Sequence, residues 1–173
     1  RKVDNMAEQW VVERGGHFFD GAVKRRIWIA STAVGGVAPG TALSTTPPMC
    51  IWNPKDSGFH VAILRAGVGY VSGTLGAGSI VIARVADQPA APTTGTELSP
   101  VPGMLGHLGR SGAARAFEGA TVLTTPTIVR AFCHLGAALA TTATFPALAS
   151  EPLEGEMVVT PGSCFVMQGV AAA

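Results

Sequence analysis

Residues 60–85 read HVAILRAGVGYVSGTLGAGSIVIARV, and this stretch decides the fold class. Apolar residues alternate with small or polar residues over His60–Ser72, and they dominate Ser79–Val85; both patterns are typical of β-strands. Residues 73–78 between them read GTLGAG, and glycine tolerates the backbone conformations of a tight turn. We therefore predict that these two strands pair as a long antiparallel hairpin.

Similar short β-prone runs, separated by Gly and Pro, lie on both sides of this stretch. Asn53-Pro54 ends one of them, because Pro fixes φ, and Gly58 suits a positive φ in the turn that follows. About eight short strands and no long amphipathic helix predict an all-β, antiparallel two-sheet sandwich, which we expect to be a jelly roll. The further predicted strands are Lys24–Thr32, Met49–Trp52, Thr121–Thr125, Thr127–Leu135, Gly155–Thr160 and Ser163–Ala173, and the longer predicted loops are Val34–Pro48, Asp87–Leu98 and Pro100–Arg115.

Residues 1–20 differ in composition from the rest of the chain. They hold several charged residues on both sides of the apolar run Trp10-Val11-Val12, and they include the pair Gly15-Gly16, which interrupts regular structure. We predict an N-terminal arm or docking segment over residues 1–20 and one sandwich domain over residues 21–173. Large apolar side chains on such an arm are typical anchors for another subunit. The candidate assembly interface consists of Trp10, Val11, Val12, Phe18 and Phe19.

Charged residues make up only 13% of the chain, against about 25% in an average globular domain. The net charge is +1, and Lys24-Arg25-Arg26 is the longest basic run. A nucleic-acid binder normally shows a basic face, so we expect no nucleic-acid partner. A surface this poor in charge suits burial by neighbouring subunits, and we expect a homo-oligomer.

Two long segments, Ile27–Pro54 and Ala131–Ser150, contain no charged residue. Both are interrupted by Pro and by Gly, Ser or Thr, whereas a membrane-spanning helix needs about 20 predominantly apolar residues. We therefore expect no membrane partner.

The residues that usually carry chemistry are scattered. The four histidines lie far apart in sequence, Cys133-His134 would point to opposite faces of a strand, and a metal site would need a shared oligomer axis. Residues 67–73 lack the spacing and the following helix of a dinucleotide loop, and Glu151, Glu154 and Glu156 have no opposing acid in the sequence. We expect no cofactor, no metal and no catalysis, and we read the three cysteines as reduced core residues.

The segment Ile51–Ala83, IWNPKDSGFHVAILRAGVGYVSGTLGAGSIVIA, resembles jelly-roll structural proteins of tailed bacteriophages. The elements that carry the resemblance are an aromatic-Asn-Pro-x-x-Ser-Gly turn and a strand that ends in GYVSGT. RGGHFFDGAVKRR at residues 14–26 and VVTPGSCFVMQGV at residues 158–170 are similar to the same group. These motifs are structural turns and strands without catalytic meaning.

The resemblance implies a virion component, made in the host cytoplasm, that forms a trimer and contacts the major capsid protein or another virion subunit. We expect a capsid decoration or cement protein whose body oligomerises through neutral strand faces while residues 1–20 anchor it to the shell. One alternative is a head or tail fibre module whose loops over residues 87–115 bind a host-surface glycan. A second alternative is a jelly-roll enzyme of the cupin or lyase type, which would need clustered histidines or paired carboxylates.

Overall fold

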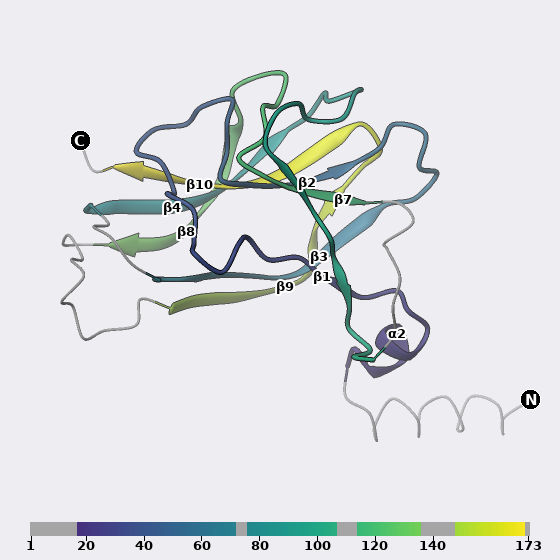
Figure 1. Cartoon of the computed structure of the whole chain (residues 1–173). Coiled ribbons are helices and arrows are strands. Elements are labelled where there is room, and N and C mark those ends of the chain that lie inside the picture. The colour runs from purple at the N-terminus through teal and green to yellow at the C-terminus, as the bar shows by residue number, and fades with distance from the viewer. Residues whose placement is uncertain (1–16, 72–75, 107–113, 136–147, 172–173) are drawn as a thin grey trace, which may run out of the picture. The chain divides into compact units, whose positions relative to one another are not determined.

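The fold is known from a computed structural model that describes residues 17–71, 76–106, 114–135 and 148–171 (Figure 1). One short helix and ten strands lie in these residues, and every strand pairing is antiparallel. The all-β class predicted from the sequence is therefore confirmed. The elements are α2 (Phe19–Val23), β1 (Trp28–Ile29), β2 (Met49–Asn53), β3 (Val61–Gly69), β4 (Gly78–Val85), β5 (Thr96–Leu98), β6 (Val101–Pro102), β7 (Arg115–Glu118), β8 (Thr127–Leu135), β9 (Leu148–Val159) and β10 (Ser163–Ala171).

The chain divides into two compact units. Unit 1 comprises residues 1–31 and 99–112 and contains α2 and the two-stranded ribbon β1–β6. Unit 2 comprises residues 32–98 and 113–173 and contains all the other strands. The predicted boundary between residues 20 and 21 falls inside α2, and the division into an arm and one domain stays a prediction.

Unit 2 is a sandwich-like arrangement of two antiparallel sheets. Six strands form one sheet in the order β5-β7-β2-β10-β4-β8, and β3 pairs with β9 in a second, smaller sheet. Figure 1 shows β3 and β9 as a layer separate from β10, β4 and β8. The sandwich is shown by this arrangement, and its classification as a jelly roll stays a proposal.

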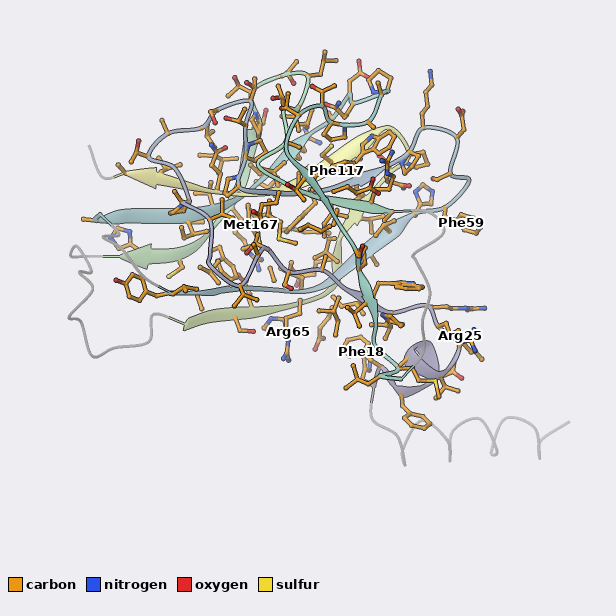
Figure 2. All side chains as sticks on the ribbon, viewed as in Figure 1. Phe18, Arg25, Phe59, Arg65, Phe117 and Met167 are labelled. Carbon is orange, nitrogen blue, oxygen red and sulfur yellow. The ribbon has the colours of Figure 1, made fainter. Side chains whose placement is uncertain are left out.

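Strand β10 is the centre of unit 2, and its sequence SCFVMQGVA explains why. Seven successive residues from Ser163 to Gly169 are buried, so both faces of the strand are covered. Because side chains alternate between faces, Phe165 and Met167 enter one apolar cluster while Cys164 and Val166 enter another. Figure 2 shows Met167 directed into the interior, whereas Arg65 of β3 points away from it.

The two apolar clusters are covered by different kinds of structure. The cluster around Ile82 and Leu153 lies between the six-stranded sheet and β3–β9. The cluster around Trp52 and Phe117 lies on the other face of the large sheet, where the loop residues Ala120 and Val122 help to close it. Each side of the large sheet therefore buries its own core, one under strands and one under loops.

The predicted hairpin is wrong in its pairing, although both strands exist. Strand β3 pairs with β9, and β4 pairs with β10 and β8, so consecutive strands lie in different sheets. The alternating pattern identifies a strand with one buried face, but it does not identify the neighbour across the ladder. Here the connection after β3 leads to the other sheet and does not close a hairpin.

Several other predictions need correction in length or number. The predicted strand over residues 24–32 shrinks to β1, and residues 121–125 contain only an isolated bridge between Thr121 and Thr93. The predicted loops contain the short strands β5 and β6, and β7 begins at Arg115. The predicted positions of β2, β8 and β10 agree with the structure, and Gly58 has the expected positive φ of 69°.

A buried amide fastens the loop before β2 to the central strand. The side-chain Nε2 of Gln168 donates to the Ala42 carbonyl oxygen at 3.0 Å and to Ser44 Oγ at 2.9 Å. The Ser44 backbone N–H donates to Gln168 Oε1 at 3.3 Å. Backbone N–H groups of Gly169 and Ala171 donate to Pro39 and Thr41. Residues 39–44 thereby continue along the side of β10 where β2 has ended.

In the part of the chain that the structure describes, no helix has the length and apolarity to cross a lipid bilayer.

Candidate assembly surface

Unit 1 has little interior of its own among its described residues. Helix α2 is five residues long and contains no buried residue, and Phe18 at its N-cap makes no side-chain capping hydrogen bond. An exposed ion pair joins Lys24 Nζ to Asp20 Oδ2 at 2.9 Å, which is worth only about 0.3–0.5 kcal/mol on a helix surface. Because short helices are stable only when an apolar face is packed, α2 depends on what it contacts.

The main packing inside unit 1 is provided by Ile27, which immediately precedes β1. Its side chain lies so close to Gly21 of α2 and to Gly103 that a Cβ added at either glycine would come within 3.1–3.2 Å of it. The Ile27 carbonyl oxygen also accepts a hydrogen bond from Gly103 N–H at 2.8 Å. Ile27 therefore connects the helix to the β1–β6 ribbon.

The ribbon turns one apolar face outward. Ile29 of β1 lies directly opposite Val101 of β6, and directly opposed residues share one face of an antiparallel pair. Both side chains are more than half exposed, whereas Pro102 on the adjacent position is buried. The ribbon therefore presents Ile29 and Val101 together to solvent.

Large apolar side chains are exposed throughout the described part of unit 1. Their exposed fractions range from 37% for Met104 to 80% for Leu105. Arg26 is also exposed and forms no ion pair with the residues that the structure describes. We call the following residues the unit 1 surface: Phe18, Phe19, Val23, Arg26, Ile29, Val101, Met104 and Leu105.

The predicted interface residues are only partly within the described chain. Phe18 and Phe19 are exposed members of the unit 1 surface, as an interface requires; Figure 2 labels Phe18. Trp10, Val11 and Val12 lie outside the described residues. The predicted interface does not include Val101, Met104 and Leu105, because residues 100–115 are predicted to be an irregular loop. The only indication in the sequence is that three large apolar residues lie close together in this segment.

Ion pairs connect β8 to β9 in unit 2. Arg130 of β8 forms ion pairs with Glu151 and Glu156 of β9, the latter at 3.4 Å from Nη1 to Oε2. Ile128 and Val129 of β8 and Val158 of β9 are each about half exposed. They do not share one face, because Ile128 lies opposite Ala83 in the large sheet and Val158 lies opposite Ala62 in the small one.

One irregularity in the β3–β9 pairing shapes the exposed part of β9. Between the pairs Ile63↔Met157 and Arg65↔Pro152, β3 supplies one residue while β9 supplies residues 153–156. This bulge buries Leu153 in the core and leaves Glu154 and Glu156 exposed, with Glu154 at a φ of 46°. Glu154 forms no ion pair within the described chain, so its charge is available to a partner.

One pair of side chains has the geometry of a nucleophile and a base. Ser79 of β4 lies opposite His134 of β8, and Ser79 Oγ is 3.0 Å from His134 Nδ1. No local sequence pattern indicates this pair, because the two residues are far apart in the chain and meet only through the β4–β8 register. A hollow that Ser79 helps to line has a volume of about 30 Å³, which is room for about one water molecule.

The buried cysteines are neighbours in space. Cys50 of β2 and Cys164 of β10 lie diagonally across the β2–β10 pair, and both thiols are free and buried. A hydrogen bond with Cys50 and burial both raise the pKa of the Cys164 thiol. Cys133 is half-buried on β8. Cys50 and Cys164 therefore lie in the core, as predicted.

A stacked ion pair closes the other end of the large sheet. Arg115 of β7 donates two hydrogen bonds to Glu97 of β5, at 2.8 and 2.6 Å, and its guanidinium lies over the rings of Trp52 and Phe117. The hydrogen bonds to Glu97 raise the pKa of Arg115, although burial acts in the opposite direction. This contact joins β5 to β7 at the edge of the large sheet.

Within the described residues, no three His, Cys, Asp or Glu side chains come together in a way that could hold a metal ion. Comparison of the chain with models of protein families found no match, and neither curated proteins nor solved structures gave one.

Proposed function

We propose that this protein is a non-catalytic structural subunit that works by assembling with copies of itself and with a larger particle. The observation that carries the proposal is the unit 1 surface, where large apolar side chains are 37–80% exposed and the described residues of the unit form hardly any core. Covering a large apolar side chain stabilises by roughly 1.5–3 kcal/mol when burial is complete. Association with another subunit that covers this surface therefore gives a favourable free energy.

The low charge of the chain supports the same proposal. Only 13% of the residues are charged, so the exterior relies on small and weakly polar residues. The resemblance of residues 51–83 to phage jelly-roll proteins supports a narrower form, in which the particle is a phage capsid and this protein is a decoration or cement protein on the virion. A trimer is the form of assembly that the resemblance implies.

The test is the mass of the full chain in solution, measured by light scattering over a range of concentrations. We expect a defined oligomer that dissociates on dilution. The same measurement on a chain with Phe19→Ser and Leu105→Ser should give a smaller species, because both changes remove exposed apolar area without touching unit 2. A wild-type chain that stays monomeric throughout would overturn the proposal.

A second candidate function, ester hydrolysis, is favoured by the Ser79–His134 pair alone. His134 would accept the proton from Ser79 Oγ while that oxygen attacks a carbonyl carbon. The ring of His134 is exposed and, among the described residues, donates no hydrogen bond to an orienting carboxylate, which weakens this candidate. Hydrolysis of p-nitrophenyl acetate that is lost in Ser79→Ala, and kept in Ser163→Ala, would support it.

A further inference from the structure

Two buried thiols lie next to each other at the centre of the large sheet. Cys50 of β2 lies opposite Val166 of β10. Cys164 lies opposite Trp52, so the two cysteines occupy diagonal positions on one face of the sheet. Both belong to the apolar cluster around Trp52, and a hydrogen bond joins the two thiols. The fold thus brings together two free cysteines that are more than a hundred positions apart in sequence.

We propose that Cys50 and Cys164 are an oxidation site, at which a small-molecule disulfide such as oxidised glutathione converts the two thiols to an intramolecular disulfide in the folded chain. One cysteine thiolate attacks the oxidant, so that a mixed disulfide forms and one thiol of the oxidant leaves. The second cysteine then attacks the sulfur of the first, and the other thiol of the oxidant leaves. The protein loses two hydrogens, and the oxidant gains them. This inference goes beyond the proposed assembly and does not depend on it.

The diagonal arrangement determines how readily the bridge opens again. Because the thiols already contact each other, closing the bridge requires only a small movement of β2 relative to β10. Diagonal neighbours nevertheless lie farther apart than directly opposed residues, so the closed bridge is strained. A strained disulfide is reduced more readily than a relaxed one. We therefore expect a reversible bridge that a mild thiol reductant removes.

Access to the two cysteines depends on what covers them. The other apolar cluster of unit 2 lies beneath β3 and β9, whereas the cluster with the cysteines is closed by loop residues, among them Ala120 and Val122. Loops open locally at a lower free-energy cost than paired strands. In the closed state, the hydrogen bond and burial raise the pKa of Cys164, and a protonated thiol does not attack a disulfide. Oxidation therefore proceeds while the loops are open.

Gln88 holds these loops in place. Its side-chain Oε1 accepts a hydrogen bond from the Leu123 backbone N–H at 2.7 Å, which joins the loop after β4 to the loop after β7. Its carbonyl oxygen accepts a hydrogen bond from Trp52 Nε1 at 2.8 Å, which holds the first loop to β2. Removal of the Gln88 amide should therefore make the loops open more often.

The experiment exposes the full-length chain to oxidised glutathione under native conditions. Samples are quenched with acid, digested with pepsin and mapped by mass spectrometry without reductant. We expect a pair of peptides linked through Cys50 and Cys164, a native tryptophan fluorescence spectrum, and recovery of both thiols with dithiothreitol. The control variant Cys133→Ser should form the same bridge, whereas Cys50→Ser should form no intramolecular bridge.

Matched glutamine variants test the route by which the oxidant enters. Gln88→Ala should speed bridge formation about tenfold, because it removes a buried hydrogen bond that closes the loops. Gln168→Ala also removes a buried amide, but that amide fastens residues 42 and 44, and the rate should change much less. In the wild type, the rate should stay nearly constant in low urea, since local opening exposes little surface.

The following results would overturn the inference. A chain that keeps all three thiols, or that carries glutathione on Cys50 or Cys164 without forming a bridge, would reject the site. A bridge that includes Cys133 would also reject it. A rate that rises with urea as steeply as global unfolding would show that the reaction needs the unfolded chain, and it would reject oxidation in the folded state.

Discussion

The apolar side chains of unit 2 are largely buried, whereas those described in unit 1 are largely exposed. In unit 2, β10 is covered on both faces, and two apolar clusters flank the large sheet. In the described part of unit 1, Ile27 provides the main packing, and the exposed apolar side chains outnumber the buried ones. The difference indicates that unit 2 supplies the stability of the fold, while the described part of unit 1 leaves apolar side chains exposed.

Hydrogen exchange gives the strongest test of this difference. Amides of β10 should exchange only on global unfolding, whereas those of β1 and β6 should exchange at least about a thousandfold faster. The measurement is exchange by mass spectrometry in dilute solution, where association does not protect unit 1. Equal protection in the two regions would contradict the comparison.

Matched leucine substitutions measure the same difference as stability. Leu153→Ala empties a fully buried site and should cost about 3 kcal/mol of unfolding free energy. Leu105→Ala removes a side chain that is 80% exposed and should cost less than about 0.5 kcal/mol. Urea titration of the two variants, followed by tryptophan fluorescence, checks both values, and similar midpoints would show that Leu105 is packed.

Matched glycine substitutions compare the space around the backbone. A Cβ at Gly169 would lie 2.5 Å from the Gly40 carbonyl oxygen, so Gly169→Ala should cost about 2 kcal/mol. A Cβ at Gly103 would come closest to the Ile27 Cγ2 atom, at 3.2 Å, and that side chain can shift; the Ile27 carbonyl oxygen would lie at 3.5 Å, an ordinary contact distance. Gly103→Ala should therefore cost less than about 1 kcal/mol, as measured by the same titration.

The smallest expected effect is a dependence of stability on pH. In the folded chain, the raised pKa of Cys164 keeps the thiol protonated, whereas the unfolded thiol ionises near its ordinary value of 9.0. The unfolded state alone loses this proton as pH rises, so the free energy of unfolding should fall above about pH 9, by at most about 1.4 kcal/mol per pH unit. Cys164→Ala should flatten the slope, as measured by the same urea titration repeated across this pH range.

The sequence predicted the strands of unit 2 better than their partners. The near-continuous apolar run of β10 and the Asn53-Pro54 stop after β2 are local signals, and the structure agrees with both. The pairing of β3 with β9 joins residues about ninety positions apart in sequence, so no local pattern indicates it. The hairpin prediction was wrong for this reason.

The candidate surfaces were less predictable than the strands. Phe18 and Phe19 were recognised because they lie in an apolar run next to charged residues. Val101 lies opposite Ile29 only because β6 pairs with β1, and Arg130 of β8 meets Glu151 and Glu156 of β9 although these residues are distant in sequence. Exposure is a property of the folded chain, and alternation alone does not say which face is left open.

The segment from Pro39 to Thr41 has a consequence for how copies of this chain avoid exchanging strands. Its carbonyl oxygens accept the N–H groups of Gly169 and Ala171, so the side of β10 beyond the end of β2 is already occupied by backbone. A central strand with free hydrogen-bonding groups would invite a strand from another molecule, as in domain swapping or fibril growth. Because residues 39–41 already pair with this stretch of β10, a strand from a second molecule finds no free hydrogen-bonding groups there. The chain can therefore expose apolar side chains elsewhere without its central sheet becoming a template for aggregation.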